Sequence, residues 1–233
     1  MPSHTYSVVG RCDRTGMLGI PITTSSIAVA ARCVWIEANV GAIATQNVTD
    51  PRLGQLGLDL MRQGYGARAV VEELVRAGRY PEYRQVACVD RDGFSATWTG
   101  TRAFPTSAEL SERNLAVAGN LLASETVVHA MAAAFRSTAE LHLAERLVRA
   151  LAAGKAAGGE AGGSEHSAGL KVCDRDSFPL VDLRVDWEEV DPVRRLGELW
   201  ERYRPEMELY RLRAIDPPAT LPATTKGGKE RHA

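Results

Sequence analysis

Pairs of amphipathic helices separate blocks of strands along this chain, and that order limits the folds open to it. Apolar alternation and β-branched residues predict strands at residues 6–10, 17–24 and 40–46. Two helices follow at 53–61 and 67–76, where apolar side chains recur at the helical period. Because strands and single helices do not alternate, we expect antiparallel sheets and not a doubly wound parallel sheet.

The second half of the chain repeats this order. Further strands are predicted at 84–89, 94–99, 115–118, 170–173 and 180–185, and further helices at 125–135 and 141–153. A long closing helix starts at Asp191-Pro192, and its apolar face continues to Met207. Helix pairs between antiparallel hairpins predict an α+β fold in which helices cover the outer faces of two sheets.

The ends of the chain and two inner segments are less regular. We expect a leader at residues 1–4, one domain over 5–215 and a disordered tail at 216–233, where almost nothing can be buried. Pro21 lacks an N–H, which predicts a sheet edge or a bulge at that position. The apolar segment 29–35 fits a strand and a helix equally well.

Composition excludes several classes of function. The chain has 28 basic and 29 acidic residues, so no nucleic-acid partner is expected. No apolar run approaches the roughly 20 residues that span a bilayer, so no membrane is expected either. The cysteines, at positions 12, 33, 88 and 173, lack metal-ligand spacing. They predict small buried side chains in a reducing cytoplasm, and neither a metal nor a cofactor.

Thr5 stands at the head of the first strand and has two interpretations. It can be an ordinary strand hydroxyl, because threonine favours strands. If residues 1–4 are removed, it becomes an N-terminal nucleophile whose own α-amine serves as the base. An α-amine has an unperturbed pKa of about 7.7–8.0, so this pair can work near neutral pH without a histidine. Ser7 and Val9 share a strand face with Thr5 by alternation.

Two amide side chains lie at the ends of predicted strands, and each can have either a catalytic or a structural role. Asn120 follows Gly119 at the end of one strand, where its N–H groups could stabilise a developing oxyanion. Gln46 ends the buried strand 40–46 and has the same capacity. The structural alternative for each is a turn residue that satisfies neighbouring backbone groups.

A glycine-rich segment at 158–163 lies between a helix and a strand. It lacks the Lys-Ser/Thr ending of a phosphate loop and the spacing of a dinucleotide-binding loop, which argues against nucleotide binding. Glu160 and His166 bracket this segment and could serve acid–base chemistry or orient a substrate. Arg84 could hold a substrate carboxylate, although most arginines are simply solvated.

Several short motifs stand in a specific order along the chain. They are Thr5-Tyr6-Ser7-Val8-Val9, Val40-Gly41-Ala42-Ile43-Ala44-Thr45-Gln46, Gly119-Asn120-Leu121-Leu122, Ala156-Ala157-Gly158-Gly159-Glu160, His166-Ser167-Ala168-Gly169 and Val181-Asp182-Leu183-Arg184-Val185-Asp186. With these motifs, residues 5–215 resemble the bacterial domain-of-unknown-function family ten-twenty-eight, which is placed in the N-terminal-nucleophile (Ntn) hydrolase superfamily.

The resemblance implies a four-layer αββα sandwich, with Thr5 at the position of the family's N-terminal threonine. That threonine usually follows the initiator methionine directly, whereas Met1-Pro2-Ser3-His4 precedes it here. Catalysis by Thr5 therefore requires cleavage before it, or a different translational start. The family carries no known substrate to transfer.

We therefore expect an Ntn-type amidohydrolase that cleaves a small amide, with Thr5 and Asn120 as catalytic residues. Residues assigned to substrate binding are Gln46, Ser26 at the bend after the second strand, Arg84, Glu160 and His166. A small molecule is the expected partner, and a homo-oligomer is left open. The alternative is a non-catalytic protein of the same fold that binds a small metabolite or a protein, which the residues before Thr5 favour.

Overall fold

The computed structural model describes residues 4–162 and 165–220. The strands are β1 (Thr5–Arg11), β2 (Leu18–Thr24), β3 (Val34–Glu37), β4 (Gly41–Asn47), β5 (Arg84–Asp90), β6 (Ser95–Thr99), β7 (Ala108–Glu112), β8 (Leu115–Asn120), β9 (Ser167–Cys173) and β10 (Val181–Val185). The helices are α1 (Ala30–Cys33), α2 (Pro51–Arg62), α3 (Ala67–Ala77), α4 (Thr126–Ser137), α5 (Leu143–Ala156), α6 (Pro192–Tyr203), α7 (Met207–Ile215) and α8 (Pro217–Thr220), with a 3-10 turn η1 (Pro81–Tyr83).

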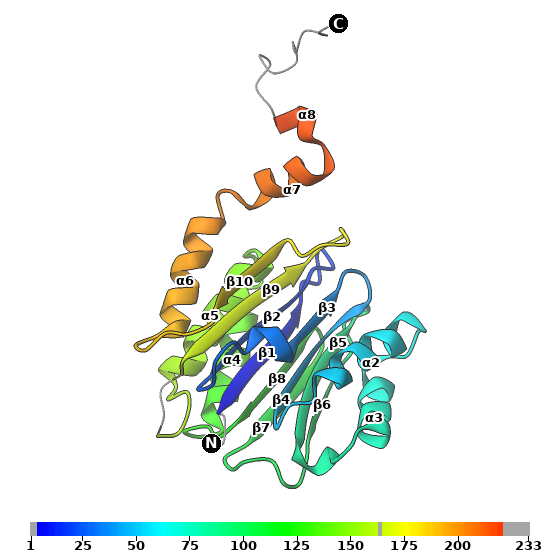
Figure 1. The fold of residues 1–233 in the computed structure, drawn as a ribbon, viewed down its shortest axis with the longest axis vertical. Helices are drawn as coiled ribbons and strands as arrows, with labels where there is room; N and C mark the ends of the chain where they lie inside the picture. Colours follow the sequence, from blue (N-terminus) through cyan, green and yellow to red (C-terminus); the bar gives the residue numbers. More distant parts are fainter. Residues whose placement is uncertain (1–3, 163–164, 221–233) are drawn as a thin grey trace, which may run out of the picture.

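The strands form two antiparallel sheets, so the prediction of a mixed α+β fold is confirmed (Figure 1). The larger sheet has six strands in the order β10-β9-β2-β1-β8-β7, and the smaller has four in the order β3-β4-β5-β6. Every pair of neighbouring strands in the described part of the chain is antiparallel.

Three apolar clusters hold the elements together. One cluster joins α4, α5 and α6 to the outer face of the six-stranded sheet, and another joins α2 and α3 to the outer face of the four-stranded sheet (Figure 1). The third lies between the two sheets, where Val9, Ile20 and Ala87 meet. Burial of these faces is the main favourable contribution to folding, at about 25 cal/mol per Å² of apolar surface.

The strand period of two divides β1 between two environments. Tyr6 and Val8 point into the cluster beneath α4 and α5, whereas Val9 points between the sheets. Ser7 also points between the sheets, because its hydroxyl reaches Gln46 of β4. The expected alignment of Ser7 and Val9 on one face is therefore confirmed, and by the same alternation Thr5 lies on that face.

Aspartate–proline pairs begin two of the helices. Asp50 precedes α2 and accepts a hydrogen bond from the backbone N–H of Arg52, with Oδ1···N 3.1 Å. Asp191 does the same for α6 through the N–H of Arg194, at 2.9 Å. Each aspartate satisfies an N–H that the helix leaves unpaired, and the proline that follows has no N–H to lose.

Pro21 does not lie at a sheet edge, so that prediction is wrong. β2 pairs with β1 on one side and β9 on the other, and Pro21 faces Leu170 of β9. The register with β1 is the same before and after the proline, so there is no bulge. The ladder instead has no paired residues at Val8 and Val9, which lie opposite Pro21 and Ile20. A missing N–H is tolerated inside a sheet when only a short part of one ladder is interrupted.

Other segments also differ from expectation. Residues 29–35 contain both structures, α1 and then the start of β3. The predicted long closing helix ends at Tyr203 and resumes as α7, because Pro205 cannot continue the backbone hydrogen bonding of α6. β7 was not predicted. Of the tail, residues 217–220 form α8, and 221–233 lie outside the described residues, as do residues 1–3 of the expected leader.

Leu147 of α5 should be a major packing contact of the six-stranded sheet. Its side chain is fully buried and lies against the strand glycines Gly10 and Gly19, whose missing side chains allow α5 to approach closely. We predict that Leu147→Ala lowers the free energy of unfolding by about 2–5 kcal/mol, because a buried cavity remains. Urea denaturation measures this, with Leu56→Ala on exposed α2 surface as the control; an equal small loss in both variants would contradict the packing.

Candidate active site

Polar residues gather where four strands of the larger sheet end. Ser167, Thr24, Thr5 and Asn120 lie directly opposite one another across β9, β2, β1 and β8. Side chains opposite one another in adjacent strands lie on the same face of the sheet. All four therefore face the smaller sheet, and all four are buried.

The smaller sheet presents a matching polar row. Gln46, Gln85 and Thr99 lie opposite one another across β4, β5 and β6. Gln85 Oε1 accepts hydrogen bonds from Gln46 Nε2 at 2.7 Å and from Asn120 Nδ2 at 3.1 Å. Ser7 Oγ donates to Gln46 Oε1 at 2.6 Å. The two rows therefore form one buried network that joins the sheets.

The hydroxyl of Thr5 lies next to the peptide bond that precedes it. Thr5 Oγ1 is 3.0 Å from Thr24 Oγ1, and Thr24 Oγ1 donates in turn to the carbonyl oxygen of His4. The same carbonyl accepts from the backbone N–H of Ser25 at 3.4 Å. Since Thr24 uses its only proton on His4, Thr5 is the donor in the threonine pair.

Asn120 lies beside Thr5, as its predicted role requires, but only some of its polar atoms have hydrogen-bond partners. One N–H is bound to Gln85, and Oδ1 is buried with no hydrogen-bond partner. The remaining amide N–H is therefore the only donor that Asn120 can offer to a reacting group.

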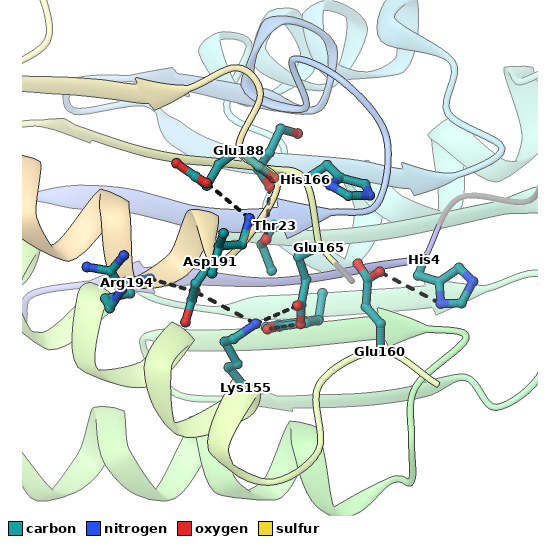
Figure 2. Close-up of polar contacts among 12 residues, drawn as sticks. His4, Thr23, Lys155, Glu160, Glu165, His166, Glu188, Asp191 and Arg194 are labelled. Atoms are coloured by element: carbon teal, nitrogen blue, oxygen red, sulfur yellow. Dashed lines mark hydrogen bonds and ion pairs between the residues drawn. The ribbon is translucent and has the colours of Figure 1, made fainter. Parts of the chain in front are cut away.

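Glu160 reaches the same end of β1 from the glycine-rich loop. Its backbone pairs with Leu122, and the N–H of Ala161 donates to the carbonyl of Leu121 at 2.8 Å. The loop is thus attached to the chain immediately after Asn120. The side chain of Glu160 is 0% exposed, and its Oε2 lies 3.7 Å from Nδ1 of His4 (Figure 2).

Burial favours the neutral forms of both members of this pair. Loss of solvation raises the pKa of Glu160 to about 8, and the charge of Glu165 adds to the rise. The positive charge of Lys155 and the backbone N–H of Ser25 oppose it only in part. Burial likewise lowers the pKa of His4, so its imidazole does not supply a strong counter-charge.

A second carboxylate near Glu160, that of Glu165, has hydrogen-bond partners on both of its oxygens. Glu165 accepts from Tyr6 Oη at 2.9 Å and from Lys155 Nζ at 2.7 Å. Lys155 also lies 3.7 Å from Asp191 Oδ1 at the start of α6 (Figure 2). Although burial opposes the charged form, Glu165 and Asp191 raise the pKa of Lys155, which keeps it protonated.

The other residues predicted to bind substrate are held by neighbouring groups. Ser26 Oγ accepts from Arg32, and its carbonyl accepts from Ser167 Oγ at 2.6 Å. His166 Nδ1 lies 3.1 Å from the carbonyl oxygen of Glu188, and its ring stacks on Trp187 with centroids 4.5 Å apart. These residues flank the polar row without facing Gln85.

Arg84 is not brought to the polar rows. Its neighbour Gln85 faces the space between the sheets, so by strand alternation Arg84 faces the opposite side. Its guanidinium donates to the backbone carbonyls of Val48 and Arg79. In this structure it supports the loops around η1.

Sequence reasoning missed several residues of this site. Thr24, Gln85, Lys155 and Glu165 each belong to segments that are unremarkable in composition. Thr24 and Gln85 carried a weak signal, since each is a polar residue at the end of an apolar strand. Lys155 and Glu165 carried none, because only the close approach of α5, β1 and the glycine-rich loop brings them together.

Within residues 4–162 and 165–220, no group of three or more histidine, cysteine, aspartate or glutamate side chains is arranged to hold a metal ion. No helix in that part of the chain is long and apolar enough to cross a membrane. All four cysteines are buried and unpaired.

Comparison with known proteins adds the family. A family model described as "Family of unknown function (DUF1028)" matches residues 5–196. The chain belongs to this family. The matched region of this DUF1028 protein begins at Thr5 and ends within α6. No curated protein matches it.

The DUF1028 chain is also similar to a solved structure, that of protein SPO2555 from Silicibacter pomeroyi, described with the same family. The two sequences are 26% identical, and the TM-score is 0.79. The match covers 86% of this chain and 89% of the other.

Gln85 should be necessary for the stability of the network. Gln85→Met keeps the length of the side chain but leaves Gln46, Asn120 and the carbonyl of Gly119 without a buried partner. Each unsatisfied group costs about 1–3 kcal/mol, so for three groups we predict a loss of at least about 3 kcal/mol in the free energy of unfolding. The control is Gln55→Met on exposed α2 surface; if both variants unfold at the same urea concentration as the parent, the network does not stabilise the fold.

Glu160 should make stability depend on pH. Its folded pKa of about 8 lies above the ordinary value of 4.5, so the stabilisation by its protonated form is complete below about pH 4.5 and is lost as pH rises to about 8. We therefore predict that Glu160→Gln is more stable than the parent at pH 8.5, by at most about 5 kcal/mol, and gains little at pH 4.5.

Urea denaturation at the two pH values measures the difference between parent and variant. Glu125→Gln, at an exposed glutamate before α4, is the control and should change little at either pH. A stability difference for Glu160→Gln that does not change with pH would contradict the shifted pKa.

Proposed function

We propose that this protein is an Ntn-type amidohydrolase that cleaves the C–N bond of a small amide, with Thr5 as nucleophile. The observation that carries the proposal is the environment of the Thr5 hydroxyl, which donates to Thr24 while Thr24 donates to the adjacent carbonyl of His4. A nucleophile, a proton acceptor and a polarised carbonyl thus lie together at the head of a central strand.

The fold supports this proposal. Helices cover the outer faces of two antiparallel sheets, and this arrangement supports our proposal of a four-layer αββα sandwich of the Ntn type. Thr5 is the first residue of β1 in the middle of the larger sheet, and the family match also begins at Thr5. A residue in that position becomes the amino terminus after a single cleavage.

Cleavage of the His4–Thr5 bond is the step that would free the nucleophile. In the uncleaved chain the nitrogen of Thr5 is a peptide nitrogen and cannot act as a base. Attack of Thr5 Oγ1 on the His4 carbonyl carbon would form an ester and break the C–N bond, and the hydroxyl proton would pass to the departing nitrogen, which becomes the α-amine. Water would then hydrolyse the ester. The hydrogen bonds from Thr24 and Ser25 to the His4 oxygen would stabilise the charge that develops there.

In the cleaved enzyme the same groups would act on the substrate. The α-amine takes the proton of Thr5 Oγ1 as it attacks the amide carbonyl, and then delivers it to the leaving nitrogen. Water hydrolyses the resulting ester in the second half of the reaction. The free N–H of Asn120 would assist the oxyanion, and Gln46 holds Asn120 in position through Gln85.

The proposed partner is a small molecule, and the proposed location is the cytoplasm. Four buried free cysteines support a reducing compartment. The second candidate function is binding of a metabolite or protein without chemistry. It is favoured by one observation, that His4 is bonded to Ser25 on both its N–H and its carbonyl, which holds the uncleaved segment in place.

N-terminal sequencing and intact mass of the purified protein test the proposal. We predict that active material begins at Thr5. Thr5→Ala should stay uncleaved and should hydrolyse any amide that the parent turns over at least about 10³-fold more slowly, because it lacks the nucleophile. Thr5→Ser should keep part of both the cleavage and the hydrolysis. Thr97→Ala, in a strand of the smaller sheet, is the matched control and should behave as the parent.

Active protein that quantitatively retains residues before Thr5, or unchanged turnover by Thr5→Ala, would refute the mechanism. Uncleaved protein that binds a metabolite tightly without forming product would favour the binding function.

A further inference from the structure

Glu160 is a buried acid for which the described residues provide no closely paired cation. Its side chain is fully buried, and neither oxygen has a hydrogen-bond partner of normal distance and angle among the described residues. The nearby backbone N–H of Ser25 favours the charged form only in part. An ionised carboxylate in such a position is costly unless a cation or several hydrogen bonds compensate it. A matching group is therefore missing from the described part of the chain.

The neighbouring charges do not provide that group. Lys155 is shared between Glu165, at 2.7 Å, and Asp191, at 3.7 Å, so its charge is already matched. The hydroxyl of Tyr6 donates to Glu165 and not to Glu160. Lys155 thus contacts two carboxylates, and Glu160 stands apart from it (Figure 2).

The nearest candidate partner is His4, which the proposed maturation removes. Its Nδ1 lies 3.7 Å from Glu160 Oε2 and makes no hydrogen bond. Its carbonyl carbon is the carbon that Thr5 attacks in that maturation step. His4 therefore occupies the place of a substrate's acyl group, with its ring nitrogen directed at Glu160 (Figure 2).

We propose that Glu160 is the binding site for a cationic nitrogen on the acyl side of the substrate, in the place that the His4 ring fills before cleavage. The proposal rests on the proposed function only in taking the His4 carbonyl as the position of the scissile amide. It names the substrate class: amides of ω-amino acids or related acyl groups that carry an ammonium or guanidinium.

The geometry of His4 also sets the length of the acyl chain. Its Nδ1 is joined to the carbonyl carbon through the α, β and γ carbons. An acyl chain with an amino group on its γ carbon places a cation at the same separation along the chain. 4-Aminobutanamide has this structure, pentanamide is its neutral counterpart of similar length, and glutaramate carries a negative charge instead.

Calorimetric titration of a chain that begins at residue 5 and carries Thr5→Ala tests the site, because the place of His4 is then vacant, the carboxylate of Glu160 is kept and no turnover occurs. We predict that 4-aminobutanamide binds at least about tenfold more tightly than pentanamide or glutaramate, as expected for a charge-assisted contact. Adding Glu160→Gln should abolish this preference, whereas adding the control Glu125→Gln should preserve it.

Equal affinity for the charged and neutral amides, no detectable binding of 4-aminobutanamide, or a preference that survives Glu160→Gln would each overturn the proposal. The comparison of three ligands needs no change at Glu160, so it stands even if that variant folds poorly. Binding is measured without turnover, so the two proposals can fail separately. Selective binding with no hydrolysis by cleaved protein would refute only the proposed amidohydrolase activity. Hydrolysis without a preference for the cation would refute only the proposed cation site.

Discussion

One amide oxygen, Oε1 of Gln85, ties the two sheets together at the end where the candidate site lies. It accepts from Gln46 in its own sheet and from Asn120 in the other. The space between the sheets is apolar over most of its length, and polar groups there are costly unless they are paired. Because the network pairs most of them, a row of buried hydroxyl and amide groups can persist beside an apolar core.

The first strand contributes side chains to two different polar environments, because successive side chains point to opposite faces of the sheet. On one face, Thr5 and Ser7 enter the network between the sheets. On the other, Tyr6 donates to Glu165, which also binds Lys155 of α5. Glu160 lies where these two environments meet, next to His4 at the head of the strand. The position of that strand in the middle of the larger sheet makes both sets of contacts possible.

Much of the fold could be predicted from local patterns. Apolar period and β-branched residues predicted the strands and most helices; the strands expected at 84–89 and 94–99, for example, are β5 and β6, which pair with each other. The failures have physical causes. Pro21 lies inside a sheet because one interrupted ladder is offset by the intact ladder to β9. The closing helix is shorter than predicted. Its apolar period continues past Pro205, but its backbone hydrogen bonding cannot. In β7 the residues are mostly polar and at a sheet edge, so no burial pattern marked the strand.

The sequence by itself determined the strand period, the helix start at Asp191, and the positions of Thr5, Asn120 and Gln46 at the ends of strands. These are local properties, set by backbone geometry and by what each side chain can bury. Only the tertiary structure decided which strand ends meet: it put Asn120 and Thr24 on either side of Thr5, and it turned Arg84 away. It also placed Glu160 against His4 in a buried site, where burial raises the pKa of a residue whose neighbours in the chain are glycine and alanine. That site combines Lys155 and Glu165, which are near Glu160 in the chain, with His4 and Ser25, which are far from it, and no local pattern encodes the combination.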